Sequence, residues 1–210
     1  MQSTPASSRE PIAIVGMACR FPGAANPREF WKMLLDGRTE VGDVPPDRWD
    51  RESLLDPDVG AGRLTNWRGG FLPDVTSFDW QAHRMLPGEA RHTDPQQRLL
   101  LELAWEALED AGMPLEAAQK SRTGVFVGIM WNDYFRLLAK NWEALDGYAL
   151  IGNPLMFAAN RISFALDLQG PSTAMDSGCA SSLVAVNAAC QSLWLGESES
   201  ALVGAVELIL

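Results

Sequence analysis

The stretch from Asp176 to Val186 holds the residues best suited to chemistry. It leaves a short expected strand, passes through small residues that include Gly178, and places the thiol of Cys179 at the first position of an apolar helix. Unpaired backbone N–H groups and the positive end of the helix dipole at such a position favour a thiolate over a thiol. The same N–H groups can hold an oxyanion during acyl transfer, so the pattern suits a covalent acyl-thioester intermediate.

A structural role for this cysteine is the alternative, because a lone cysteine in an apolar segment is more often a small buried side chain than a nucleophile. For Cys19, after an expected strand, and Cys190, in the middle of an expected helix, the structural role is favoured. Eleven residues of helix separate Cys190 from Cys179 by about 16 Å, too far for assistance. Three cysteines and two histidines give neither a metal-ligand spacing nor a disulfide framework, so we expect reduced thiols and no bound metal.

Short apolar runs alternate with helical segments along the chain, and this alternation predicts a layered α/β fold. The expected strands are 12–16, 123–129, 172–176 and 201–206. The expected helices follow the N-caps Asn26 and Asp94 and cover 154–168 and 180–195. The last of these is apolar or small throughout, which predicts burial on nearly all sides. Residues 38–92 are expected to form a long insertion whose aromatic side chains pack against the rest of the fold.

Composition narrows the class of protein. Of the 210 residues, 47% are apolar and 21% charged, which is typical of one soluble globular domain or part of one. The 17 basic and 27 acidic side chains give a net charge of −10, so binding to nucleic acid or to an anionic membrane surface is not expected. Neither a membrane-spanning segment nor a secretory signal is recognisable, so we expect a cytoplasmic protein. Residues 1–9 are expected to form a flexible leader.

Four stretches resemble, in order and spacing, the β-ketoacyl synthase (ketosynthase) domain of modular type I polyketide synthases, within the thiolase-like superfamily. They are 10–23 (EPIAIVGMACRFPG), 44–49 (VPPDRW), 94–102 (DPQQRLLLE) and 169–172 (QGPS), the last of which leads into the cysteine turn. The resemblance covers residues 10–210. It implies that Cys179 is the acyl-accepting nucleophile of the family.

The chain departs from the family pattern around the expected nucleophile. Ser177, Gly178 and Ala180 stand where the family usually has threonine, alanine and serine, and all three are small enough for the turn to form. Thr93 stands where the family commonly has methionine, directly before the second N-cap. These departures concern local packing and leave the family resemblance intact.

The resemblance implies a fold and a reaction. Ketosynthases consist of two similar α/β halves stacked as a five-layer sandwich, and they act as homodimers. The cysteine takes an acyl chain from the phosphopantetheine arm of an acyl carrier protein, and a malonyl-type extender is decarboxylated and attacks this acyl-enzyme. The resemblance further implies that the backbone N–H of Cys179 forms part of the oxyanion hole and that the domain binds no cofactor of its own. It also implies that an acyltransferase domain neighbours it in the full synthase of polyketide, or by analogy fatty acid, biosynthesis.

Two histidines of the family's second half assist decarboxylation, and we expect them to be absent from these 210 residues. The chain is therefore expected to be the N-terminal part of a ketosynthase domain, residues 10–210, and to be incompetent for condensation by itself. His83 and His92 are expected to be solvated surface residues. One alternative is a non-catalytic scaffold, a decayed ketosynthase fragment that binds carrier protein or a partner subunit. A cysteine hydrolase on an unrelated fold is the weakest alternative, because neither histidine stands in a recognisable relation to the cysteine.

Three further motifs allow more than one interpretation. The segment 131–134 is expected either to line a substrate entrance or to start a helix capped by Asn132. Arg161 is expected to form a buried ion pair or, less favoured, a dimer or site contact. The side chains of Arg84, Arg91 and Arg98 could form a basic patch for an acidic carrier protein, with ordinary solvated charges as the default.

Overall fold

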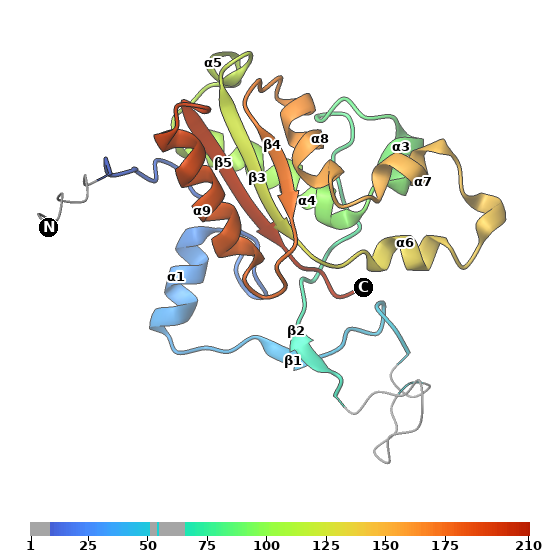
Figure 1. The fold of residues 1–210 in the computed structure, drawn as a ribbon. Helices are drawn as coiled ribbons and strands as arrows, with labels where there is room; N and C mark the ends of the chain where they lie inside the picture. Colours follow the sequence, from blue (N-terminus) through green and yellow to red (C-terminus); the bar gives the residue numbers. More distant parts are fainter. Residues whose placement is uncertain (1–8, 51–53, 55–65) are drawn as a thin grey trace, which may run out of the picture.

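A three-stranded parallel sheet forms the centre of the molecule (Figure 1). The computed structural model describes residues 9–50, 54 and 66–210. Its elements are α1 (Pro27–Leu35), β1 (Val41–Asp43), β2 (Arg68–Gly70), α3 (Pro87–His92), α4 (Pro95–Asp110), α5 (Leu115–Ala118), β3 (Thr123–Ile129), α6 (Asp133–Leu138), η1 (Trp142–Ala144), α7 (Gly147–Gly152), α8 (Phe157–Ala165), β4 (Ser172–Met175), α9 (Ser181–Trp194) and β5 (Ser200–Val206). The expected leader lies outside the described residues except for Arg9.

The strand order is β4-β3-β5, so β3 is hydrogen-bonded on both sides. All seven residues of β3 are buried, as expected for a continuous apolar run in the middle of a parallel sheet. Gly128 of β3 pairs with Met175 of β4, and Ile129 pairs with Val206 of β5. The carboxyl ends of the three strands therefore meet at one edge of the sheet.

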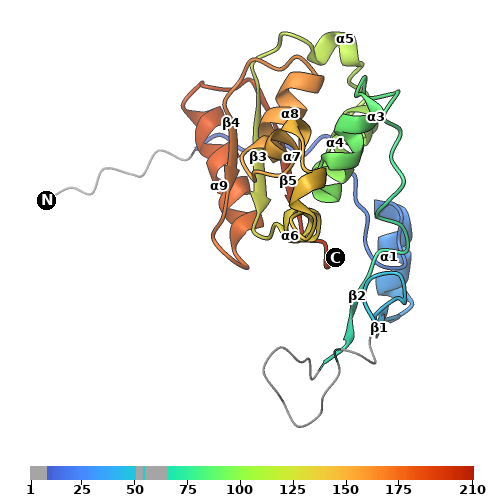
Figure 2. The ribbon, with the colours of Figure 1, turned by 90° about the vertical axis from the view of Figure 1, so that its right-hand side faces the viewer.

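Helices cover both faces of this sheet (Figure 2). α9 lies on one face, where Ala185 and Ala189 are buried against Phe126 of β3. α4 and α8 lie on the other face, and the core there includes Leu101 and Ile162. This arrangement of helices on both faces of a parallel sheet confirms the predicted layered α/β fold.

Both predicted N-caps form. Asn26 accepts a hydrogen bond from the backbone of Glu29 at 2.9 Å, and the Glu29 carboxylate accepts in return from the backbone of Ala25. Asp94 accepts from the backbone of Gln96 at 2.8 Å. Such caps satisfy backbone N–H groups that have no partner inside the helix, and so they fix where α1 and α4 begin.

The expected strand 12–16 is wrong. No strand pairs with this segment in the described part of the chain, and the side chain of Ile14 is 82% exposed. Instead, single hydrogen bonds hold the residues on either side of this segment. The backbone carbonyl of Glu10 accepts from the Trp194 indole on α9, and the backbone N–H of Met17 donates to the Asp110 carboxylate at the end of α4. A short apolar run shows that a segment favours burial, but it does not reveal whether a ladder partner lies beside it.

The prediction that α9 is buried on nearly all sides is also wrong. Only one stripe of the helix is buried, and it consists of Ser181, Ala185, Ala189 and Ser192. Leu183 is 74% exposed. In the following strand β5, Val203 and Ala205 are exposed as well. The small residues of α9 face the sheet because they allow close approach, and its large apolar residues point away from it.

The insertion 38–92 packs against the rest of the fold, as predicted. Its β1 and β2 form a short antiparallel pair, and the rings of Trp49 and Phe71 meet edge to face at 5.9 Å. Phe78 and Trp80 reach further and contact the main core beside α4 and α8. Residues 51–53 and 55–65 of the insertion lie outside the described part.

Among the described residues, no helix has the length and apolar character needed to span a bilayer.

A polar cluster joins α3, α4 and α8. The guanidinium of Arg161 on α8 forms an ion pair with Glu89 on α3 at 2.8 Å, and it also donates to the side chain of Gln97 on α4 at 3.1 Å. The two charged side chains are only 11% and 22% exposed. Arg161 therefore forms the ion pair that the favoured interpretation expected, in a partly buried setting.

We predict that Glu89→Ala destabilises the protein by about 3 kcal/mol, because it leaves the Arg161 guanidinium largely buried without its carboxylate. The urea midpoint of unfolding measures the effect. The matched control is Asp36→Ala, which removes the exposed Lys32–Asp36 pair on α1 and should leave the midpoint nearly unchanged. Equal midpoints for the two variants would contradict the prediction.

Candidate active site

Cys179 lies at the edge of the sheet where the three parallel strands end. It follows β4 by four residues and precedes α9 by two, and its side chain is exposed. Ligands of open α/β sheets bind at this carboxyl edge, in the crevice where loops leave neighbouring strands. The thiol thus stands at the position where the fold class places ligand chemistry, and it is open to a reagent from solvent.

The turn that carries the thiol is tightly hydrogen-bonded. The Ser181 hydroxyl donates to the carbonyl of Gly178 at 2.7 Å and accepts from the backbone of Ser177 at 2.9 Å. Asp176 accepts from the backbone of Gly178 at 2.9 Å. Gly178 has φ +58°, a left-handed conformation that is strained for residues with a Cβ. The turn is thereby fixed from both ends around Cys179.

The helix begins one residue after the start of the expected range 180–195, and two residues after Cys179, which was expected at its first position. The first helical residue is Ser181, and Ala180 is its N-cap, without a side-chain oxygen to hold the cap. The backbone N–H groups of Ala180 and Ser181 bond to carbonyls three residues earlier, in turn geometry that precedes the helix. Cys179 therefore sits in the turn before the helix and not at its first position. The role of its backbone N–H in an oxyanion hole stays a prediction.

Gly128 brings the central strand against the first turn of α9. A Cβ at this position would lie 2.7 Å from the carbonyl carbon of Ser181 and 2.9 Å from the nitrogen of Ser182. Those atoms are backbone and cannot move away without shifting the helix. A glycine is therefore required for α9 to start where it does, directly beside Cys179. The sequence offered a signal that went unused, since a lone glycine within a strand often marks close backbone approach.

The other two cysteines are partly buried, unlike Cys179. Burial is the main cause of a raised pKa at Cys19, with Arg20 acting in the opposite direction. Cys190 lies inside α9, away from either end. Their surroundings fit the predicted structural role better than a reactive one.

Neither histidine is the solvated surface residue that the sequence predicted. His83 stacks on Phe78 with ring centroids 5.0 Å apart, and burial lowers its pKa. His92 ends α3, where its Nδ1 lies 3.0 Å from the carbonyl of Gly88 and 3.5 Å from the Asp146 carboxylate. These partners belong to the insertion, to α3 and to the N-cap of α7, and none of them lies in the turn that carries the candidate nucleophile.

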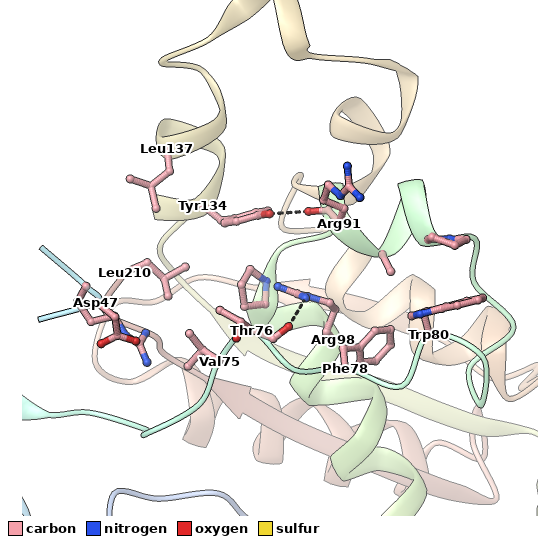
Figure 3. Close-up of a pocket in the computed structure, with 14 residues that line it drawn as sticks. Asp47, Val75, Thr76, Phe78, Trp80, Arg91, Arg98, Tyr134, Leu137 and Leu210 are labelled. Atoms are coloured by element: carbon pink, nitrogen blue, oxygen red, sulfur yellow. Dashed lines mark hydrogen bonds between the residues drawn. The ribbon is translucent and has the colours of Figure 1, made fainter. Parts of the chain in front are cut away.

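A pocket of about 510 Å³ opens beside the N-terminal end of α4 (Figure 3). The guanidinium of Arg98 points into it and donates to the carbonyl of Thr76 at 3.1 Å, while the hydroxyl of Tyr134 donates to the carbonyl of Arg91. Arg98 is partly buried, and this burial lowers its pKa, whereas a solvated charge was the default expectation. Arg84 does not line the pocket, and the three arginines expected as one patch are therefore not gathered there.

The segment 131–134 starts a helix. Asn132 accepts a hydrogen bond from the backbone of Phe135 at 3.2 Å and so caps α6. Trp131 directly follows the carboxyl end of β3. The segment 131–134 therefore starts a helix, as one of the two interpretations proposed, and it belongs to the loop that leaves the carboxyl end of β3.

The family model of the β-ketoacyl synthase N-terminal domain matches residues 9–210. The chain belongs to this family. One component of the phenolphthiocerol/phthiocerol polyketide synthase of Mycobacterium tuberculosis is 47% identical over 203 residues, which are 96% of this chain and 13% of that protein. Another component of the same synthase is 45% identical over 204 residues, 96% of this chain and 11% of the protein.

Solved ketosynthases share the fold. An oxazolomycin ketosynthase domain from Streptomyces albus matches with a TM-score of 0.87 and 41% identity, over 93% of this chain and 34% of that one. The ketosynthase from module 6 of the bacillaene synthase of Bacillus subtilis matches with a TM-score of 0.80 and 37% identity, over 93% and 31%. These matches confirm the predicted ketosynthase resemblance and thiolase-like fold class. The chain spans about a third of these ketosynthase chains and a smaller share of the synthase proteins.

We predict that Gly128→Ala shifts the start of α9, destabilises the protein by about 1–3 kcal/mol and changes the alkylation rate of Cys179 by iodoacetamide. The matched control is Gly204→Ala on β5, where the added Cβ meets the tip of Leu100 at 3.0 Å, a flexible side chain that can yield. Alkylation is followed by intact mass in native buffer. An unchanged rate in Gly128→Ala would show that the close approach does not position the thiol.

Proposed function

We propose that this chain carries the acyl-accepting site of a condensing acyltransferase that works in polyketide assembly. The supporting observation is the exposed thiol of Cys179 at the carboxyl edge of a parallel sheet, in a turn fixed by Ser181 and Gly178, within a chain of the β-ketoacyl synthase family. The relatives with the same segment are components of a polyketide synthase. That context favours an acyl carrier protein as the donor of the acyl chain.

In the proposed first step, the Cys179 thiolate attacks the carbonyl of an acyl thioester on the phosphopantetheine arm of the carrier protein. The bond between Cys179 sulfur and the acyl carbon forms, the bond to the arm's sulfur breaks, and the arm leaves as a thiolate that takes up the proton given by the cysteine. The N–H groups of Ser177, Gly178, Ala180 and Ser181 are engaged inside the turn, so we propose the backbone N–H of Cys179 as the donor that stabilises the oxyanion of the intermediate. The step exchanges one thioester for another, so nothing is oxidised or reduced.

In the proposed second step, a malonyl-type extender on another carrier protein loses CO₂, and its carbanion attacks the acyl carbon held by Cys179. The new carbon–carbon bond releases the cysteine as a thiolate. His83 and His92 are engaged by Phe78, Gly88 and Asp146, so they are poorly placed to assist this step. We therefore propose that these residues support acylation, that condensation needs the rest of a ketosynthase domain, and that the intact domain acts as a homodimer beside an acyltransferase domain.

Acylation is tested by incubating the protein with an acyl-carrier thioester and measuring its intact mass. We expect one acyl adduct on the wild type and none on Cys179→Ala. The matched control is Cys190→Ala, which removes a partly buried thiol of α9 and should keep the adduct. Absence of an adduct on the folded wild type would favour a non-catalytic scaffold, and equal labelling of the Cys179 variant would place the nucleophile elsewhere.

A further inference from the structure

Gln96 is a buried residue that the proposed chemistry does not use. It is the second residue of α4 and only 1% exposed. Its side-chain amide donates to the carbonyl of Trp131 at 2.8 Å and accepts from the backbone N–H of Leu208 at 3.3 Å. Trp131 follows β3 by two residues, and Leu208 follows β5 by two residues. One side chain thus joins the loops that leave two neighbouring strands.

The position of this amide follows from the register of the sheet. Ile129 and Val206 are the last paired residues of β3 and β5, so a continued ladder would set Trp131 opposite Leu208. The direct ladder ends at these strand ends, and the Gln96 amide then binds one backbone group from each side. The side chain thus replaces the next pair of direct backbone hydrogen bonds. Because it is longer than a direct bond, the segments after β3 and β5 can move apart while their buried backbone groups keep hydrogen-bond partners.

The orientation of the amide is itself fixed. Its NH₂ group lies 3.4 Å from a carboxylate oxygen of Asp94, whose other oxygen caps the backbone of Gln96. Asp94 is 1% exposed, and burial is the main cause of its raised pKa. The N-cap of α4 therefore holds the amide with its donors toward Trp131 and its acceptor toward Leu208.

The carboxyl end of β3 adjoins the start of α9, directly after the cysteine turn. Gly128, three residues before Trp131, packs against the backbone of Ser181 and Ser182 at the start of α9. Any shift of the β3 end is therefore transmitted to the turn that holds Cys179, because the contact is between backbone atoms with no flexible side chain to absorb it.

We infer that Gln96 is a positioning residue, which spreads the loops after β3 and β5 and holds the edge of the sheet on which Cys179 receives its acyl group. The inference rests on the proposed function for its effect on acylation, but the bridge itself is a property of the fold. Small displacements of positioned groups reduce rates strongly, so loss of the bridge is expected to slow acylation.

The test compares Gln96→Met with Gln97→Met. Gln97 is the next residue of α4 and equally buried, at 1%, but its amide donates to Pro154 and accepts from Arg161, away from the two loops. Both substitutions remove a buried amide of the same size, so both lower stability. Only Gln96→Met should speed hydrogen exchange at the Leu208 amide and slow the acylation of Cys179 from a carrier thioester, by about tenfold or more.

Gln96→Asn serves as the second variant if Gln96→Met does not fold. It keeps an uncharged amide beside the buried Asp94, but its side chain is one methylene shorter and is not expected to reach both Trp131 and Leu208. Unchanged exchange at Leu208 in the folded Gln96→Met protein, or equal slowing of acylation in Gln97→Met, would overturn the positioning role. If the wild type itself is not acylated, the proposed function fails, and exchange at Leu208 together with iodoacetamide alkylation of Cys179 still decides the role of Gln96.

Discussion

The close approach of Gly128 to the first turn of α9 is the contact on which the geometry of the site depends. Gly128 belongs to β3, which is buried on both faces and hydrogen-bonded on both sides, so β3 is the most constrained strand of the sheet. Because α9 begins in close contact with the backbone of β3, the start of this helix is held in place by the strand. The cysteine turn connects β4 to α9, and both of its ends are held by these packed elements. Within the turn, the hydrogen bond of Ser181 and the left-handed conformation of Gly178 fix the backbone. Such support matters for an exposed thiol on a loop, because functional groups are held more precisely when rigid elements brace them.

Buried amides extend the same constraint to the other side of the sheet. Gln96 and Gln97 are adjacent on α4, yet one binds the loops after β3 and β5 while the other binds Arg161 of α8 and the loop before it. A buried amide left without partners costs free energy, so each glutamine fixes the element that satisfies it. The N-terminal turn of α4 acts as an anchor for the carboxyl edge of the sheet and for the ion pair of Arg161.

Large apolar side chains remain on the surface of the described residues. Leu183 and Leu195, on α9 and directly after it, are 74% and 71% exposed, and Ile14 of the N-terminal segment is 82% exposed. Leu183 stands in the first turn of α9, two residues after Ser181, so whatever packs against it will lie close to the cysteine turn.

The sequence by itself determined most of the elements and the nucleophile candidate. Local signals were sufficient there: the caps at Asn26 and Asp94, the buried run of β3, and the small-residue turn around Cys179 each depend on neighbouring residues only. The family motifs then fixed the fold class. Tertiary structure decided what depends on distant partners. It showed that residues 12–16 form no ladder within the described part of the chain, that α9 buries only its small residues, and that His83 packs on Phe78. It also revealed Gly128 and Gln96, because a strand glycine and a helix glutamine gain their roles only from the backbone that the fold brings against them.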